Sequence, residues 1–359
     1  MRVLHVHSGN LYGGVETFLL SLARFRALAP SMDMSVALTS DGRIAADLRH
    51  AGVPVTILGE ARVSRPFTVW RARRVLASLV QSQRPDVIVC HQPWPLALFG
   101  PVAKRHSIAL VLWMHMTASR HWLDRLAWRV HPGTVVCNSR FTASTLPKSN
   151  ARIEVVYAPV DAGAARAART ASANGRVVII QVSRMEPLKG HAVLLKALAQ
   201  LRDRDRWTCC FAGGAQRPHE AQYMETLRAE AATLGIADRV DFLGDRSDVQ
   251  HLLGGADIYC QPNVEPEAFG LSLIEAMAAG LPVVTSALGG AKEIVDETCG
   301  VLVAPRDPAT LASELSALLE SRSRRERLGA GGPARARALC DPAVQMPRIG
   351  EILQKAAAQ

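Results

Sequence analysis

The sequence predicts an α/β protein made of two doubly wound halves, each a parallel sheet with helices on both faces. Short β-branched runs alternate with amphipathic stretches along nearly the whole chain, which is typical of such sheets. One stretch breaks the alternation: residues 161–176 are rich in Ala, Arg and Ser, lack apolar periodicity and are predicted to form a linker. The length of 359 residues fits two domains of ~100–200 residues each.

The first half opens with "RVLHVHS" (2–8), which predicts a buried strand, and "GGVETFLLSLARFRAL" (13–28), which predicts the helix after it. Further strands of this half are expected where β-branched and apolar residues recur, at 35–40, 54–59, 86–91, 108–115 and 133–139.

The second half repeats the pattern, with a helix expected at 190–203. Its strands are expected at 177–183, 207–213, 239–244, 256–262, 281–287 and 300–305. We expect a first domain at 1–163, onto which a last helix within 341–359 packs back, and a second domain at 164–340. Since ligands of open α/β sheets bind beyond the carboxyl ends of the strands, a cleft between two facing domains is the expected site.

The composition is that of a globular protein, with 48% hydrophobic and 21% charged residues. No apolar run reaches the ~18–20 residues of a membrane span, and the first ten residues lack the apolar core of a signal peptide. The seven cysteines form no Cys-x-x-Cys pair, which favours a reducing compartment over a structural zinc site. We therefore expect a cytoplasmic protein.

The net charge of +10 is concentrated in the first half, where 19 Lys and Arg face 9 Asp and Glu up to Asp161, with 23 of each kind after it. This asymmetry suggests an anionic partner for that half, such as a membrane surface or an acidic substrate. The alternative, that these charges only keep the protein soluble, remains open.

Two basic stretches are candidates for a membrane contact at the inner face of the plasma membrane. A helix at 65–80 would expose Arg71, Arg73 and Arg74 and bury Val69, Ala72, Leu76 and Leu79. The stretch 119–131 mixes Arg120, Arg125 and Arg129 with Trp122 and Trp128. Basic helices with tryptophan bind anionic membranes, but such helices also occur packed on a sheet with solvated arginines.

Glycines follow the first strand in "HSGNLYGGVETF", where Gly9, Gly13 and Gly14 lead into the helix. Glycines at this place allow a ligand to approach the backbone, and the helix N-terminus favours a phosphate. The spacing is not Gly-x-Gly-x-x-Gly, so the dinucleotide fingerprint is missing.

At the matching place of the second half stands "SRMEPLKGH", in which Arg184 and Lys189 follow a strand directly. A guanidinium fork and an ammonium group five residues apart can hold a diphosphate. Two solvated loop cations are the alternative; the strand-end position favours the ligand role.

Two glutamates stand in the otherwise uncharged run "EAFGLSLIEAMAAGLPVV" (267–284). Ser272 and Glu275 have the spacing of a helix capping box, which would explain Glu275 structurally. A carboxylate at the start of a short apolar helix can equally accept hydrogen bonds from two vicinal sugar hydroxyls. The two roles are compatible, and Glu267 is expected in the loop before the helix.

This run, with its Glu-x7-Glu spacing, resembles the signature of retaining glycosyltransferase family 4, which has the two-domain GT-B fold. Further stretches resemble that family's landmarks in its order: "GGVETFLLSLA", "NSRFTAS", "VSRMEPLKG", "FAGGA", "RVDFLG" and "GGAKEIV". The resemblance covers nearly the whole chain. It implies transfer of a sugar from a nucleotide-diphosphate sugar to a hydroxyl acceptor, in polysaccharide, glycolipid or glycoconjugate synthesis.

The resemblance implies a role for each matching residue. Arg184 and Lys189 would hold the diphosphate, Glu275 the ribose hydroxyls, and Glu267 would face the donor sugar. Gly14, the backbone of Ala268, Phe269, Gly270 and Leu271, and His115 would complete the donor site. Asn138 and Ser139 match a landmark to which we assign no role. Without the resemblance, His115 would be interpreted as a strand-end histidine bonded to backbone, and His91 is interpreted as structural.

The resemblance also implies front-face attack, in which a phosphate oxygen takes the proton of the acceptor hydroxyl. No carboxylate is placed as a nucleophile, and Arg184 and Lys189 would stabilise the departing diphosphate. No Asp-x-Asp metal motif follows any of the predicted strands, so a metal-independent enzyme without a cofactor is expected.

Three other functions are weighed. A GT-B epimerase or sugar-nucleotide hydrolase would turn over the donor without an acceptor. A nucleic-acid-binding protein would need aromatic residues interleaved with the basic ones, whereas the aromatic content is 5%, so no nucleic-acid partner is expected. An NAD-dependent oxidoreductase would need the missing fingerprint.

Overall fold

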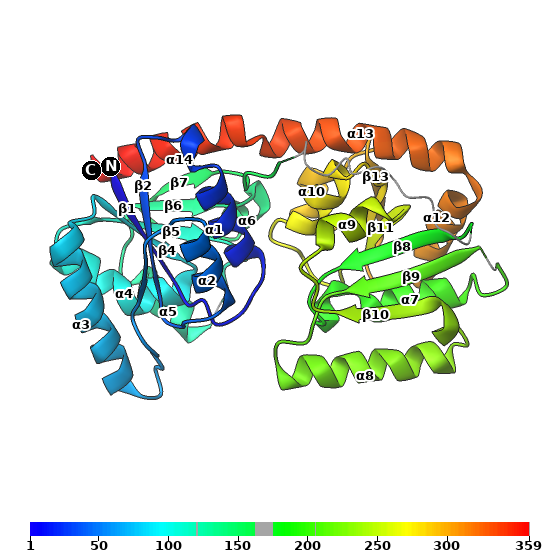
Figure 1. The fold of residues 1–359 in the computed structure, drawn as a ribbon, viewed down its shortest axis with the longest axis horizontal. Coiled ribbons are helices and arrows are strands. Elements are labelled where there is room, and N and C mark those ends of the chain that lie inside the picture. Colours follow the sequence, from blue (N-terminus) through cyan, green and yellow to red (C-terminus); the bar gives the residue numbers. More distant parts are fainter. Residues whose placement is uncertain (120, 162–174, 205, 359) are drawn as a thin grey trace. The chain divides into compact units, whose positions relative to one another are not determined.

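The computed structural model describes residues 1–119, 121–161, 175–204 and 206–358 (Figure 1). It divides the chain into two compact units, one of Met1–Pro159 with Pro342–Gln359 and one of Val160–Asp341. The linker expected at 161–176 lies, except for its ends, outside the described residues. The boundary expected between residues 163 and 164 lies outside them too.

The first unit is built on a seven-stranded parallel sheet of order β3-β2-β1-β4-β5-β6-β7. Its strands are β1 (Arg2–His7), β2 (Asp33–Leu38), β3 (Val55–Ile57), β4 (Val87–His91), β5 (Ala109–Met114), β6 (Thr134–Cys137) and β7 (Arg152–Val155). Six of these were predicted. Strand β7 was not predicted, because this edge strand has no buried residue and its sequence, "RIEV", carries two charges instead of a buried apolar run.

Helices connect these strands. They are α1 (Gly14–Arg24), η1 (Arg26–Leu28), α2 (Arg43–His50), α3 (Pro66–Gln83), α4 (Pro93–Arg105), α5 (Trp122–Trp128) and α6 (Arg140–Ser144). The last helix of the chain, α14 (Pro342–Ala357), belongs to this unit and packs against η1, β4 and β5.

Helix α3 differs in two positions from the expected pattern. Arg71 and Arg74 are exposed as predicted, but Arg73 is half-buried, and its Nε donates a 2.5 Å hydrogen bond to the Leu98 carbonyl of α4. Leu79 is also only half-buried, whereas Val80 is buried. The buried face of the helix thus includes Val80 in place of Leu79, and Arg73 binds a carbonyl of α4 instead of pointing into solvent.

The second unit has a six-stranded parallel sheet of order β10-β9-β8-β11-β12-β13, and every strand was predicted. The strands are β8 (Val177–Val182), β9 (Trp207–Ala212), β10 (Val240–Gly244), β11 (Ile258–Gln261), β12 (Val283–Ser286) and β13 (Gly300–Val303). Its helices are η2 (Pro187–Lys189), α7 (His191–Ala199), α8 (Pro218–Thr233), η3 (Ala237–Arg239), α9 (Val249–Gly254), α10 (Leu271–Ala278), α11 (Ala291–Ile294), α12 (Pro308–Glu320) and α13 (Arg322–Cys340).

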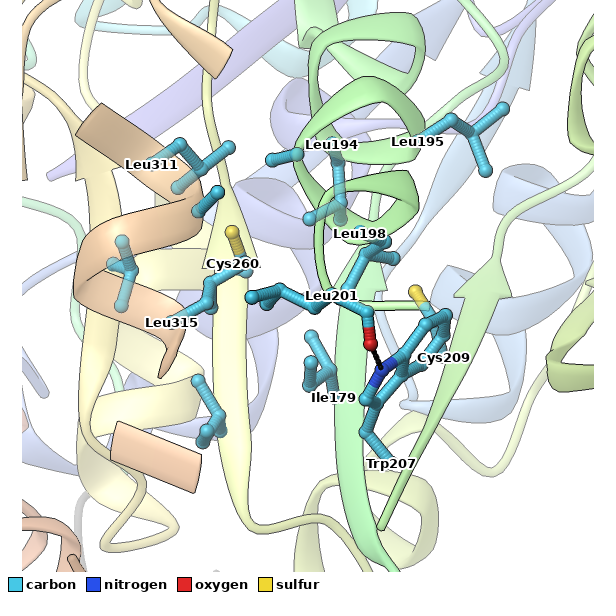
Figure 2. Close-up of a cluster of buried hydrophobic side chains, with 14 of the residues drawn as sticks. Ile179, Leu194, Leu195, Leu198, Leu201, Trp207, Cys209, Cys260, Leu311 and Leu315 are labelled. Atoms are coloured by element: carbon cyan, nitrogen blue, oxygen red, sulfur yellow. Dashed lines mark hydrogen bonds between the residues drawn. The ribbon is translucent and has the colours of Figure 1, made fainter. Parts of the chain in front are cut away.

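The core of the second unit fixes α7 on the sheet (Figure 2). Leu194 and Leu198 of α7 are fully buried, together with Leu315 of α12. Trp207, at the start of β9, is buried as well, and its Nε1 donates to the Leu201 carbonyl at 3.0 Å. Each such leucine contributes about 1.5–3 kcal/mol to folding, so the loop between β8 and α7 is held at both ends by packed elements.

Both sheets reverse their strand order at one place. In the first sheet this place lies between β1 and β4, and in the second between β8 and β11. Ligands of doubly wound sheets bind at the carboxyl ends of the strands at such a switch point. The residues that follow β1, β4, β8 and β11 are therefore the ones to inspect for chemistry.

Candidate functional site

In the second unit, an ion pair joins the loops that follow the two switch-point strands. Lys189 Nζ lies 2.5 Å from Glu267 Oε2, and both side chains are largely buried. Gly190, just after Lys189, has a φ of +77°, and a Cβ there would stand 1.9 Å from the Pro262 carbonyl oxygen. Only glycine allows the β8 loop to lie so close to the β11 loop, and this contact brings the two charged groups together.

Amide side chains lie under the Glu267 carboxylate. Asn263 Nδ2 donates to Glu267 Oε2 at 3.1 Å, and Gln261 Nε2 donates to Asn263 Oδ1 at 3.0 Å. Burial opposes ionisation of Glu267, but the charge of Lys189 and the hydrogen bonds from Lys189 and Asn263 outweigh it and hold its pKa below the ordinary value. Glu267 is therefore a fixed, ionised carboxylate.

Arg184, two residues after β8, is held from the side of α8. Its Nη1 lies 2.9 Å from Glu186 Oε1 and 3.4 Å from Glu220 Oε1. The Glu220 side chain is fully buried, and its other oxygen accepts from the Gln216 backbone N–H at 2.7 Å. Since a guanidinium group has five N–H donors, Arg184 is oriented by these carboxylates and keeps donors for a ligand.

Glu275 does not belong to a capping box, and the structural interpretation of Ser272 and Glu275 is wrong. Gly270, at φ +100°, is the residue before the first turn of α10, so Glu275 lies beyond that turn. Ser272 Oγ instead donates to Gln261 Oε1 at 3.2 Å. Burial raises the pKa of Glu275 to about 7, and among the described residues its carboxylate has no hydrogen-bond partner. A half-buried carboxylate with a raised pKa and no partner favours a ligand role over a structural one.

The segment between Glu267 and α10 is fixed by its neighbours. Ala268 and Phe269 are buried, and Gly290 donates its N–H to the Glu267 carbonyl at 2.8 Å. A Cβ on Gly290 would lie 2.5 Å from the Ala268 carbonyl oxygen. Leu271 begins α10, and the first N–H groups of a helix have no partner within it, so this backbone can meet an anionic or hydroxyl-bearing ligand.

In the first unit, the switch point carries three histidines in a row. His5 Nδ1 lies 2.9 Å from His91 Nε2, and His91 Nδ1 lies 2.9 Å from His115 Nε2. The residues come from β1, β4 and the end of β5, which are neighbours in the sheet. Burial lowers the pKa of His5 and His115 to about 3 and that of His91 well below its ordinary value. All three rings are therefore neutral at neutral pH.

The glycine loop of the first unit is braced by the same strand end. His7 Nε2 contacts Glu16 Oε1 at 2.7 Å, and the other oxygen of Glu16 accepts from the Gly13 N–H at 2.9 Å. Gly14 is exposed as the first residue of α1. Ser139 is a helix cap, since its Oγ accepts from the Thr142 N–H at 2.9 Å, which gives the "NSRFTAS" run a structural role.

The structure thus gathers the predicted residues of the second unit, Arg184, Lys189, Glu267–Leu271 and Glu275, around β8 and β11. His115 and Gly14 lie at the corresponding edge of the first unit. Sequence reasoning missed Glu220, Gln261 and Asn263, and it left His91 structural although His91 bonds directly to His115. The only local signal was that Gln261, Asn263 and His91 stand at strand ends.

Within the described ranges, no group of three or more His, Cys, Asp or Glu could hold a metal ion. No helix among those residues has both the length and the apolar character needed to cross a bilayer.

The two Rossmann-like units have the GT-B fold. HepE from Anabaena, solved in complex with UDP and glucose, has a TM-score of 0.87 at 23% identity and is similar over 99% of both chains. WaaG, a glycosyltransferase involved in lipopolysaccharide biosynthesis, has a TM-score of 0.73 at 17% identity over 98% of this chain and 99% of its own.

Sequence comparison gives the family. The model "Glycosyltransferase Family 4" matches residues 12–163, and "Glycosyl transferases group 1" matches 165–335. A phosphatidyl-myo-inositol mannosyltransferase of Mycobacterium leprae is 30% identical over 91% of this chain and 89% of its own length. A D-inositol 3-phosphate glycosyltransferase of Salinispora tropica is 39% identical over 45% of this chain, a match that spans about a third of that relative's length. The chain belongs to glycosyltransferase family 4 and is a transferase enzyme.

Proposed function

We propose that the protein moves a sugar from a nucleotide-diphosphate sugar to a hydroxyl acceptor with retention of configuration. The observation that carries this proposal is the grouping of Arg184, Lys189, Glu267 and Glu275 around the switch point of the second unit. Two cations, one ionised carboxylate and one buried carboxylate without a partner match the needs of a diphosphate, a sugar and a ribose. No metal or cofactor enters the proposed reaction.

Arg184 and Lys189 would bind the diphosphate and stabilise the negative charge that develops as it leaves. Lys189 Nζ has three donors and gives one to Glu267, so two remain for phosphate oxygens. Arg184 is held by its ion pair with Glu220, and Glu267, the partner of Lys189, is held by Asn263. Little reorganisation of the two cations is therefore needed when the charge develops on the leaving group. Front-face attack then requires only that a phosphate oxygen take the acceptor proton.

Glu275 would accept hydrogen bonds from the two ribose hydroxyls. Its buried position makes an unpaired negative charge costly, and two hydroxyl donors remove that cost. Glu267 and the backbone from Ala268 to Leu271 would contact the sugar and the diphosphate. Gly14 and His115 keep the donor roles that the family resemblance implies.

The acceptor is proposed to be lipid-linked or acidic, with synthesis of a glycolipid, polysaccharide or glycoconjugate as the process. Two relatives support a lipid acceptor by name: the phosphatidyl-myo-inositol mannosyltransferase above, and a GDP-mannose-dependent phosphatidylinositol monomannoside mannosyltransferase of Mycolicibacterium smegmatis, 28% identical over 66% of this chain. Such an acceptor would place the enzyme in the cytoplasm, at the inner face of the plasma membrane.

Helix α3 supports contact with an anionic membrane. Phe67 and Trp70 are 65% and 51% exposed and stack on each other, with ring centroids 5.7 Å apart. The Arg74 guanidinium lies 4.8 Å from the Trp70 ring centroid, and Arg71 is exposed beside it. Exposed aromatic rings among arginines suit the interface of an anionic bilayer.

The predicted basic stretch around α5 supports an acidic acceptor. A cavity of about 750 Å³ in the first unit is lined by Arg125, Arg129 and Lys148 together with Trp128. Three cations beside an indole ring suit an anionic group. Arg120, the other arginine of this stretch, lies outside the described residues.

A thermal-shift screen with UDP, GDP, ADP and dTDP tests the donor site, since a ligand of the folded state raises stability by several kcal/mol at ~100–1,000 times its Kd. We expect one nucleotide to raise the melting temperature and the shift to vanish in Arg184→Ala and Glu275→Ala. Lys196→Ala is the matched control, because Lys196 lies on α7 in a mostly exposed ion pair with Glu230. A shift that survives in both site variants would contradict the assignment.

Product analysis separates transfer from the neighbouring functions. Turnover of the donor in the absence of any acceptor, at the rate seen with one, would favour the epimerase or hydrolase.

Flotation with anionic vesicles tests the membrane contact: binding at physiological salt should be lost in Arg71→Glu/Arg74→Glu and kept in Arg49→Glu, an exposed arginine of α2. If the wild-type protein does not bind the vesicles, the membrane contact is refuted, and the proposed transfer reaction is unaffected.

A further inference from the structure

The histidine chain of the first unit has a direction. In each of its two hydrogen bonds, one ring nitrogen donates an N–H and the other accepts it. Because all three rings are neutral, each carries one proton. The three rings must therefore carry their protons on the same nitrogen, either Nδ1 in all three or Nε2 in all three.

In the first arrangement, the protons point outward. His5 donates from Nδ1 to His91, His91 donates from Nδ1 to His115, and His115 carries its proton on Nδ1. In the second arrangement, the protons point inward: His115 and His91 donate from Nε2, and the proton of His5 stands on Nε2.

The inner end of the chain decides between them. His5 is fully buried, and His5 Nε2 has no hydrogen-bond partner among the described residues. The inward arrangement would leave a buried N–H without an acceptor there, which native structures avoid more strictly than an unused acceptor. The outward arrangement leaves His5 Nε2 with only a lone pair that accepts no hydrogen bond.

The outer end of the chain is accessible. His115 is half-buried, and its Nδ1 has no hydrogen-bond partner among the described residues. Phe18 of α1 packs against the His115 ring, with centroids 5.1 Å apart. Trp113 stacks on the ring of His91, which is the hydrogen-bond partner of His115. The ring is thus held on its sides while Nδ1 stays available to a ligand.

We propose that His5 and His91 are positioning residues that fix His115 as a hydrogen-bond donor at Nδ1. In the proposed function, this donor would meet an oxygen atom of the donor sugar. The sugar contact rests on the proposed function, whereas the direction of the chain does not. A fixed donor distinguishes oxygen acceptors from groups that can only donate. His115 would therefore contribute to sugar selection without carrying a charge.

Nitrogen NMR of the protein labelled with 15N-histidine tests the direction of the chain without any substrate. In the wild-type protein we expect the His115 resonances of a neutral ring protonated at Nδ1, assigned by their loss in His115→Gln. Protonation at Nε2, protonation at both nitrogens, or an exchanging mixture of tautomers would each overturn the proposal.

Two variants test the positioning. His91→Phe keeps a stacked ring but removes the donor, so His115 should lose its single tautomer. His91→Asn, whose amide stands near the place of Nδ1, should restore it. Cys90→Ala is the matched control, because Cys90 is a buried neighbour on the same strand outside the chain. A His115 tautomer that is unchanged in His91→Phe would contradict a positioning role.

The sugar contact has its own measurement: the ratio of the affinity for UDP-glucose to that for UDP, and of GDP-mannose to GDP. With the pair that binds, the ratio should fall about 3- to 10-fold in His115→Gln and His91→Phe, the worth of one hydrogen bond. A ratio unchanged in both, with the predicted tautomer seen by NMR, would refute the sugar contact and leave the direction of the chain standing.

Discussion

The switch points of the two sheets have the same topology but opposite chemistry. In the second unit, Arg184 and Lys189 face Glu220 and Glu267, and each charge is held by another. In the first unit, the chain from His5 through His91 to His115 is neutral, since burial lowers the pKa of every ring in it. The comparison shows that the fold fixes where a ligand can bind, while the residues at the strand ends decide whether the contact is ionic or neutral.

The largest expected effect comes from alanine substitution of the loop glycines of the two units. Gly190 and Gly9 follow the equivalent strands β8 and β1, and both have positive φ. A Cβ at Gly190 meets the Pro262 backbone at 1.9 Å, whereas a Cβ at Gly9 meets only Leu38 and Ile44 side chains at 3.3 Å. We expect Gly190→Ala to lower the free energy of unfolding by about 3–5 kcal/mol and Gly9→Ala by about 1–3 kcal/mol.

Chemical denaturation of both variants measures the difference. Gly235→Ala is the control for the backbone conformation alone, because φ is +69° there and nothing lies within 4 Å. Equal losses in Gly190→Ala and Gly235→Ala would show that the close approach of the two loops is not needed.

Removal of Lys189 should abolish most of the activity. Lys189→Ala takes away a donor to the leaving diphosphate and leaves Glu267 buried without its cation, so kcat should fall about 10²–10³-fold. Steady-state kinetics with the donor found in the thermal-shift screen measures this. Lys196→Ala should keep wild-type kcat, and a change in KM alone for Lys189→Ala would contradict a role in the reacting state.

Glu275 should make stability depend on pH. Burial raises its pKa from 4.5 to about 7, so the folded chain holds this proton more tightly than the unfolded chain. Stability should therefore decrease as the pH rises from the unfolded to the folded value. Above pH 7, Glu275→Gln should be more stable than wild type by roughly 1–3 kcal/mol, and at pH 4 the two should be equal.

Melting curves from pH 4 to 8 measure this effect. Glu265→Gln, at an exposed position two residues before Glu267, is the control and should follow the wild-type profile. If Glu275→Gln also follows that profile, the carboxyl is solvated in the folded state.

Substitution of Glu220 should have the smallest effect, a modest loss of affinity for the nucleotide. Glu220→Gln keeps the shape under Arg184 but removes the charge, so the affinity for the nucleoside diphosphate should fall about 3- to 10-fold while folding is kept. Isothermal titration measures it, with Glu230→Gln of the same helix as control. A full loss of folding would instead show that Glu220 acts mainly through the Gln216 backbone.

Local patterns in the sequence predicted every strand but β7, because buried parallel strands are continuous apolar runs. They failed where a strand is exposed, as in β7, and where a neighbour decides the rotation of a helix, as for Arg73. The capping box at Ser272 was wrong because Gly270 takes the cap position, so the helix begins at Leu271, earlier than the polar spacing suggests.

The sequence by itself determined the class of fold, and it predicted Arg184, Lys189, Glu267 and Glu275 as candidate site residues at or near strand ends. Only the tertiary structure decided what holds them. Glu220 meets Arg184 across 36 residues, and His91 meets His5 across 86. Such contacts leave no periodic signal in the chain, because they depend on which strands become neighbours and on which side chains are buried together.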